Sequence, residues 1–196
     1  MRSGKIKRKT AETQIEVLVT IDGQGRAEVD TGIGFFDHML HHLARHGLFD
    51  MRVRAKGDLH IDPHHTVEDV GICLGKAFLE AIGDGRGLVR FGHATTPMDE
   101  ALAEVALDFS GRPFLHFDAD LPQGRVGDFD IELTEEFLRA FSVHARMTLH
   151  VTLRHGRNAH HCIEGIFKAL ARALREALTQ DPRVKDVPST KGMLET

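Results

Sequence analysis

A five-residue motif, His-His-x-x-Glu, occurs twice in this chain, at residues 64–68 and again at residues 160–164. The two copies are 96 residues apart, and several leucine and alanine positions behind them keep the same offset. Upstream, an offset of 98 places His38 opposite Glu136. Self-similarity of this kind indicates that one supersecondary unit occurs twice. We therefore expect a single domain, residues 1–196, made of two repeats at about 1–92 and 93–196.

Hydrophobic periodicity assigns similar elements to both halves. In the first half we predict strands at residues 13–21, 26–30 and 51–55. We predict helices at residues 35–45 and 64–82. In the second half we predict strands at residues 98–109, 114–117 and 147–153, and helices at residues 134–144 and 160–178. Each half thus reads strand, strand, helix, strand, helix. This order predicts an α+β fold in which two four-stranded sheets pack with their helices.

Glycine-containing segments are predicted to separate these elements. Residues 22–25 (DGQG) predict a hairpin between the first two strands, and Ser110-Gly111 predicts a turn in the second half. Gly47 and Gly83 are expected to end the two helices of the first half.

Composition excludes several classes of partner. The net charge of −4 gives no support for a nucleic-acid or membrane-surface partner, and no apolar run has the length of a transmembrane span. The basic first ten residues are not followed by the apolar region of a secretory signal. Cys73 and Cys162 fall in apolar helical patterns, which predicts buried, reduced thiols and a cytoplasmic protein.

The repeated motif has the spacing of metal ligands. On a helix, residues four apart share a face, so His64 and Glu68 can hold one ion, while His65 points about 100° away. The second copy offers His160 and Glu164 in the same way, with His161 diverging. Imidazole and carboxylate ligands without thiolate suit Mn, Fe or Zn. A solvated polar helix face is the alternative, but two register-matched copies favour a metal site.

Other histidines are interpreted by their position. His38 and Glu136, matched by the repeat, could each complete one metal site. His41 and His42 are expected nearby in structural or supporting roles. The remaining strand histidines are expected at the surface, without a site: His93, His116, His150 and His155.

Basic and hydroxyl side chains near predicted turns suggest a phosphate-binding site. Arg90 and Arg112 lie beside predicted strands, where a guanidinium can donate two hydrogen bonds to phosphate oxygens. Residues 188–192 (PSTKG) add hydroxyls, a lysine and a glycine. A surface salt bridge and a loose tail are the alternatives. No Walker sequence or GxGxxG precedes a helix, so nucleotide binding has no support.

Together these residues closely resemble the imidazoleglycerol-phosphate dehydratase family over essentially the whole chain. The resemblance rests on KTAET at 9–13, DTGIGFFDHML at 30–40, ARHGLFD at 44–50, GDLHIDPHHTVEDVGICLG at 57–75, PMDEAL at 97–102, DFSGRP at 108–113, GRNAHHCIEGIFKALARALR at 156–175 and PSTKG at 188–192.

The resemblance implies a site, residue by residue. The implied metal ligands are His38, His64, His65, Glu68, Glu136, His160, His161 and Glu164. Many members have histidine at the position of Glu136. The implied substrate contacts are Glu12, His42, His46, Arg90, Arg112, Ser189 and Lys191. The family uses two Mn²⁺ ions per active site, and its sites lie between subunits of a shell of twenty-four chains.

The implied reaction removes water from imidazole glycerol phosphate in histidine biosynthesis and gives imidazole acetol phosphate. No carbonyl acidifies the proton to be lost, so the imidazole ring must act as the electron sink. A dimetal-bound imidazolate could expel the hydroxyl and form a diazafulvene-like intermediate, from which a base takes the next proton. Glu12 is the expected proton-transfer carboxylate, followed by Glu68 and Glu164.

Two other functions fit part of the sequence. A dinuclear metallohydrolase would release free phosphate from a phosphate ester. A metal-storage protein would account for the histidines but would give no role to Arg90, Arg112 and the PSTKG segment.

Overall fold

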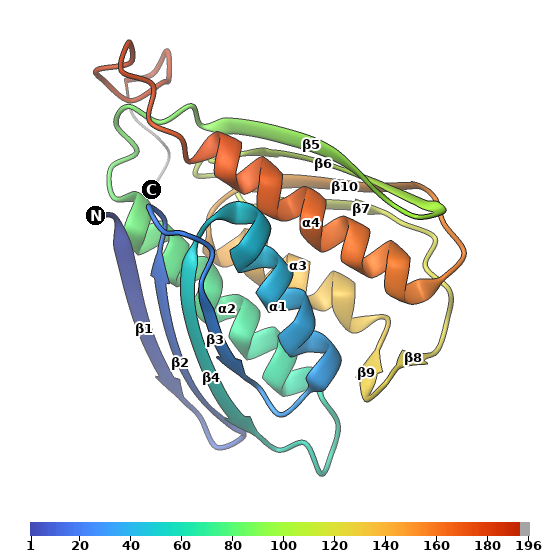
Figure 1. The fold of residues 1–196 in the computed structure, drawn as a ribbon. Coiled ribbons are helices and arrows are strands. Elements are labelled where there is room, and N and C mark those ends of the chain that lie inside the picture. Colours follow the sequence, from blue (N-terminus) through green and yellow to red (C-terminus); the bar gives the residue numbers. More distant parts are fainter. Residues whose placement is uncertain (193–196) are drawn as a thin grey trace.

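Two four-stranded sheets enclose four helices in the computed structural model, which describes residues 1–192 (Figure 1). The first sheet holds β1 (Ser3–Lys9), β2 (Thr13–Thr20), β3 (Ala27–Asp30) and β4 (Asp50–Gly57). The second holds β5 (Phe91–Met98), β6 (Ala101–Asp108), β7 (Phe114–Asp118) and β10 (Thr148–His155). The helices are α1 (Gly34–Gly47), α2 (His64–Ile82), α3 (Leu133–His144) and α4 (Ala159–Ala177). A small ribbon of β8 (Arg125–Val126) and β9 (Phe129–Asp130) precedes α3.

Both sheets have the same topology. Their strand orders are β1-β2-β4-β3 and β5-β6-β10-β7, with the last pair parallel and the others antiparallel. The two predicted four-stranded sheets and the α+β class are therefore confirmed. The predicted hairpin at residues 22–25 is wrong, because β3 pairs with β4 and not with β2. The turn at Ser110-Gly111 likewise leads to β7, which pairs with β10.

Each four-stranded sheet also contains one strand that none of the predicted ranges identified as separate. The missing strands, β1 and β5, are edge strands with little hydrophobic alternation. Gly4 and Gly92 face the helices, and a Cβ on either would meet the carbonyl oxygen of Ala77 or Ala173 at 2.0 Å. β1 carries charged residues on both faces, and the inward residues of β5 are the small Gly92, Ala94 and Thr96, so neither strand shows a hydrophobic alternation of period two.

The helix ends agree with the sequence except at α1. Gly83 ends α2, as predicted, with φ +64°. Gly47 is still helical and buried, and the left-handed residue is Leu48, with φ 58°. A Cβ on Gly47 would lie 2.2 Å from the Phe49 ring, so glycine is needed there for packing and not for its backbone angle.

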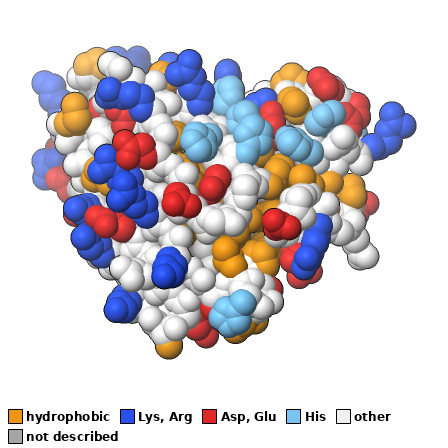
Figure 2. Space-filling view, turned by 60° about the horizontal axis from the view of Figure 1, so that its bottom comes forward, with side chains coloured by type: hydrophobic (Ala, Val, Ile, Leu, Met, Phe, Trp, Pro, Cys, Tyr) orange, Lys and Arg blue, Asp and Glu red, His pale blue; other side chains and the backbone are white. Residues whose placement is uncertain are grey.

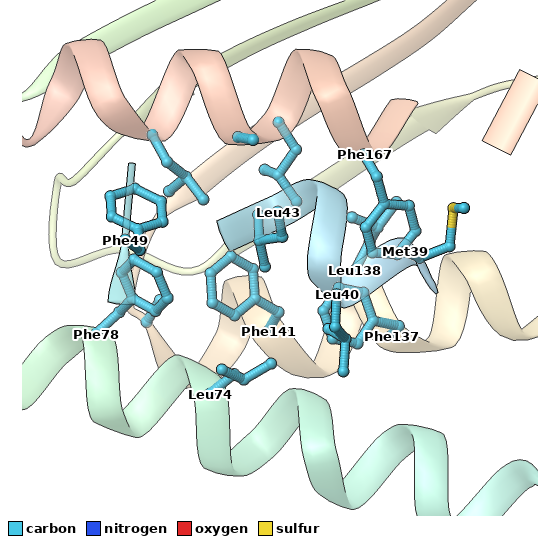
Figure 3. Close-up of a cluster of buried hydrophobic side chains, with 14 of the residues drawn as sticks. Met39, Leu40, Leu43, Phe49, Leu74, Phe78, Phe137, Leu138, Phe141 and Phe167 are labelled. Atoms are coloured by element: carbon cyan, nitrogen blue, oxygen red, sulfur yellow. The ribbon is translucent and has the colours of Figure 1, made fainter. Parts of the chain in front are cut away.

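The core lies between the sheets, where each helix of one half packs on a helix of the other. α1 packs against α4, and α2 packs against α3. Figure 3 shows the interior, where Leu43 of α1 and Phe141 of α3 lie among the buried side chains. Cys73 and Cys162 are buried, free thiols, as predicted. None of the described helices is long and apolar enough to cross a membrane.

Candidate metal centre and phosphate-binding residues

Three imidazoles converge on one buried carboxylate where α1 meets α4. Oε2 of Glu164 lies 3.2 Å from Nε2 of His38, 3.2 Å from Nε2 of His42 and 3.1 Å from Nε2 of His160. Ligand atoms of His38, His160 and Glu164 all lie within 4.8 Å of one another. The helical spacing of His160 and Glu164 and that of His38 and His42 bring the four side chains together. We call these four residues the α1–α4 cluster.

Burial and charge set the protonation of this cluster. Burial raises the pKa of Glu164, but Lys168 and the nearby histidines lower it more, and it falls to about 2. Nζ of Lys168 lies 2.6 Å from Oε1, which leaves Oε2 for the imidazoles. Burial lowers the pKa of His42 to about 4, although Glu164 opposes the shift. At neutral pH the cluster thus contains an ionised carboxylate and a neutral His42, the forms in which these groups bind metals.

The first motif, at the start of α2, has different neighbours. Nδ1 of His65 lies 3.0 Å from Oδ2 of Asp58, and Nε2 lies 3.9 Å from Oε1 of Glu12, which projects from the β1–β2 turn. The hydrogen bond from His65 to Asp58 raises the pKa of His65. The backbone N–H of His64 donates to Asp62.

His161, the second histidine of the α4 motif, also binds a carboxylate. Its Nδ1 lies 2.7 Å from Oε2 of Glu100 in the β5–β6 turn, and this hydrogen bond raises the pKa of His161. The same hydrogen bond lowers the pKa of Glu100 to about 2, with help from backbone N–H groups. Histidine side chains visible on one face gather mainly in a band beside acidic groups (Figure 2).

The predicted phosphate-binding residues gather at a different corner of the molecule. The Arg90 guanidinium donates to Asp108 at 2.6 Å and, through Nη1, to the carbonyl oxygen of Pro188 at 2.7 Å. This contact ties the PSTKG segment to the start of β5. Within that segment the backbone N–H of Lys191 donates to the Ser189 hydroxyl. We call Arg90, Arg112, Ser189 and Lys191 the basic corner.

The loop that carries Arg112 is joined to the same strands. The backbone N–H of Arg112 donates to the Ser110 hydroxyl at 3.1 Å, and the N–H of Phe109 donates to the carbonyl oxygen of Arg90. Arg90 has φ 74°, a left-handed angle that is costly for a residue with a side chain and is often found at functional sites.

The basic corner and the α1–α4 cluster lie at opposite ends of α4. The N–H of Arg90 donates to the carbonyl oxygen of Ala177, the last residue of α4, whereas His160 is in its first turn. At 1.5 Å per residue the two groups are about 25 Å apart along the helix. A single small substrate cannot span that distance.

Comparison with known proteins identifies the family. The sequence profile of imidazoleglycerol-phosphate dehydratase matches residues 31–174. The imidazoleglycerol-phosphate dehydratase of Symbiobacterium thermophilum is 59% identical over 193 residues, which cover 98% of this chain and 93% of the relative. The enzyme of the same name from Thermoanaerobacter pseudethanolicus is 59% identical over 99% of this chain and 100% of its own length. The chain belongs to the imidazoleglycerol-phosphate dehydratase family.

Solved dehydratase structures have the same fold. Imidazoleglycerol-phosphate dehydratase from Staphylococcus aureus gives a TM-score of 0.83 at 43% identity, covering 91% of this chain and 99% of that one. IGPD from Pyrococcus furiosus gives a TM-score of 0.84 at 38% identity, covering 96% and 100%.

Within this member of the dehydratase family, the structure separates the expected ligands into groups. His38, His160 and Glu164 come together, and His42, expected to contact substrate, joins them. The other expected ligands lie outside that cluster: His64, His65, Glu68, Glu136 and His161. His46 lies one turn beyond His42, with ring centroids 5.5 Å apart, and burial lowers its pKa.

Sequence patterns assigned no role to several charged residues that contact the expected ligands, among them Lys168, Asp58 and Glu100. Lys168 could have been found, because it follows Glu164 by four residues on the same helix. Asp58 lies in a turn seven residues before His65, and Glu100 lies in a turn 61 residues before His161, so no helical spacing rule points to either.

Proposed function

We propose that this protein dehydrates imidazole glycerol phosphate to imidazole acetol phosphate in histidine biosynthesis. The observation that carries the proposal is the α1–α4 cluster, in a chain whose family and close relatives have that activity in their names. The basic corner adds groups suited to the phosphate of such a substrate.

The α1–α4 cluster fits a divalent metal. One ionised carboxylate oxygen and three imidazole nitrogens face one another, and a buried neutral His42 is ready to act as a ligand or to contact the substrate ring. This donor set suits Mn²⁺, and we propose two ions per active site. The proposed ligands are His38, His64, His65, Glu68, Glu136, His160, His161 and Glu164. Bound metal would stabilise negative charge on the substrate imidazole.

The chain's own residues would supply the remaining functions. Lys168 holds Oε1 of Glu164 and so directs Oε2 toward the imidazoles. Glu12 is exposed on the β1–β2 turn, 3.9 Å from His65, where it can exchange a proton with a substrate bound at that motif. Glu68 and Glu164 are the alternative proton-transfer groups. The basic corner would bind the phosphate.

We further propose that each active site lies between subunits. The separation of about 25 Å along α4 means that a basic corner and a metal cluster acting on one substrate belong to different chains. The expected assembly has twenty-four subunits, and the expected location is the cytoplasm. The shared sheet topology and matched motifs support two repeats of one unit, about 1–92 and 93–196.

The test is the product formed. Metal-free protein is prepared with chelator, and imidazole glycerol phosphate is added with and without Mn²⁺. We expect an imidazole ketone phosphate only with metal. Free phosphate would instead indicate a metallohydrolase, and metal uptake without substrate binding would indicate storage.

A complementation experiment tests the sites between subunits. His160→Ala and Lys191→Ala are each expected to be nearly inactive at low substrate concentration. Refolding or co-expressing the two variants together should restore part of the activity, because some sites then take His160 from one chain and Lys191 from another. If both residues act from the same chain, every site carries a defect and the mixture stays inactive. Two His160→Ala preparations mixed together are the control.

A further inference from the structure

Glu100 connects the β5–β6 turn to the start of α4. Its Oε1 accepts hydrogen bonds from the backbone N–H groups of Arg157 at 3.2 Å and Asn158 at 2.7 Å. Its Oε2 accepts from Nδ1 of His161 at 2.7 Å. Asn158 is the N-cap of α4, and its side chain accepts from the N–H of His160. One carboxylate therefore holds both the helix start and the ring of His161.

The two carboxylate oxygens of Glu100 accept hydrogen bonds from different groups. Oε1 faces two N–H donors, and an ionised carboxylate can only accept hydrogen bonds. Oε2 must then accept from Nδ1, which fixes the proton of a neutral His161 on Nδ1 and the lone pair on Nε2. Nε2 has Oδ2 of Asp99 at 3.8 Å, beyond hydrogen-bond distance. Carboxylates that fix a histidine tautomer in this way commonly support metal-ligating histidines.

The first half shows the same elements in a different arrangement. β1–β2 and β5–β6 have the same pairing register at an offset of 88 residues, which places Glu12 and Glu100 at equivalent positions. In the first half Asp58, not the turn glutamate, binds Nδ1 of the second histidine, His65. Glu12 lies instead on the Nε2 side of that ring. The equivalent glutamates thus face opposite nitrogens of equivalent histidines.

We propose that Glu100 is a positioning residue that fixes the tautomer of His161, so that Nε2 is presented to a metal, while its counterpart Glu12 remains available for proton transfer. This inference rests on the proposed metal-dependent function. It assigns different roles to two glutamates that occupy the same place in the two halves.

Glu100→Gln tests the tautomer directly. The amide oxygen can keep the two backbone N–H donors, so its NH₂ group would face His161. That group donates, which forces the ring proton onto Nε2 and blocks ligation there. Glu100→Ala removes the hydrogen bonds of both oxygens but leaves the ring free to choose its tautomer. Glu100→Gln should therefore be the more stable of the two variants, and Glu100→Ala should bind metal more tightly.

The measurement is Mn²⁺ affinity of the metal-free full-length protein, from the spin-resonance signal of free Mn²⁺. We expect Glu100→Gln to weaken binding by roughly 10- to 100-fold and Glu100→Ala to weaken it less. Thermal unfolding in chelator should rank them the other way, with Glu100→Gln more stable than Glu100→Ala. Glu104→Gln is the control: it removes a charge on β6 that pairs with Arg154 of β10, and it should match the wild type in affinity.

A second substitution extends the test to the first half. Oδ1 of Asp58 is buried with no hydrogen-bond partner among the described residues, so an Asp58→Asn amide can turn to keep its oxygen on His65. We expect a smaller loss of affinity than in Glu100→Gln. Binding by Glu100→Gln equal to or tighter than that of Glu100→Ala would overturn the positioning role. If the wild type itself binds no Mn²⁺, the proposed metal function fails first, and this inference fails with it.

Discussion

The two His-His-x-x-Glu motifs have the same letters but different surroundings. In α4, His160 and Glu164 meet two histidines of α1 inside the same chain. In α2, the motif residues lie outside that cluster, and the packed helix is α3. The repeat places Glu136 and Ala140 of α3 where α1 has His38 and His42.

Two glycines of α2 allow α3 to pack more closely on it, so the α2–α3 pair leaves less space between the helices than the α1–α4 pair. A Cβ on Gly71 would lie 2.9 Å from Phe137 O, and one on Gly75 would lie 2.6 Å from Phe141 O. α3 therefore packs directly on the backbone of α2. At an offset of 96 residues, α4 has Phe167 and Ala171 at these positions. Among the described residues, the α4 motif therefore meets two further histidines of the same chain, whereas the α2 motif lies beside a helix with Glu136 and Ala140 at the matching positions.

The largest expected effect tests whether both motifs serve one reaction. His64→Ala and His160→Ala should each reduce turnover by roughly 10³-fold or more, because a metal's contribution of several kcal/mol is lost. Turnover and bound Mn²⁺ are measured on the same samples. Near-normal turnover in folded His64→Ala would make the α2 motif a solvated helix face and restrict the chemistry to the α1–α4 cluster.

The next effect separates the equivalent glutamates. Glu12→Gln should lower turnover by roughly 10²–10⁴, the usual share of general acid–base catalysis, with Mn²⁺ content unchanged. Glu100→Gln should lower Mn²⁺ affinity instead. Steady-state kinetics at saturating Mn²⁺ distinguish the two. Unchanged turnover in Glu12→Gln would move the proton transfer to Glu68 or Glu164.

A smaller effect tests the packing difference. Gly75→Ala should destabilise the protein by roughly 1–3 kcal/mol, because its Cβ would strike the backbone of α3. Gly165→Ala in α4 has its nearest neighbour, Ala103 Cβ, at 3.5 Å and should stabilise the helix by up to about 1 kcal/mol. Denaturant midpoints at matched protein concentration give both values. Equal effects would refute the closer approach of α2 and α3.

The smallest effect concerns an ion pair that differs between the halves. Arg26 pairs with Asp50 at an exposed rim, whereas Arg90 and Asp108 are mostly buried beside the PSTKG segment. The hydrogen bond from Arg26 lowers the pKa of Asp50 below 3.8, so the pair stabilises the fold above that pH and loses its effect as the pH falls through the folded pKa.

Arg26→Met should therefore slightly lower the thermal midpoint at pH 7, and the difference from the wild type should shrink as the pH falls below 3.8. Midpoints measured from pH 7 down to pH 2 check this. A difference that persists unchanged in acid would assign the effect to packing of the arginine and not to its charge.

Local sequence patterns were enough to predict the helices, the α+β class with two four-stranded sheets, and the ligand spacing within each motif. These features depend on local periodicity and on residues four apart on one helix, which a chain displays without its neighbours. The pairs His160–Glu164 and His38–His42 are local in this sense. The edge strands β1 and β5 were not predicted, because β1 is charged on both faces and β5 has only small residues facing inward.

Which elements contact one another could be learned only from the folded chain. The pairing of α1 with α4, the parallel position of β3 beside β4, and the contact of Glu100 with His161 join residues distant in sequence. Such contacts depend on packing of the whole core, which local patterns do not encode. The separation of the basic corner from the α1–α4 cluster is of the same kind, because α4 runs along β5, with Arg90 bound at one end and Glu100 at the other.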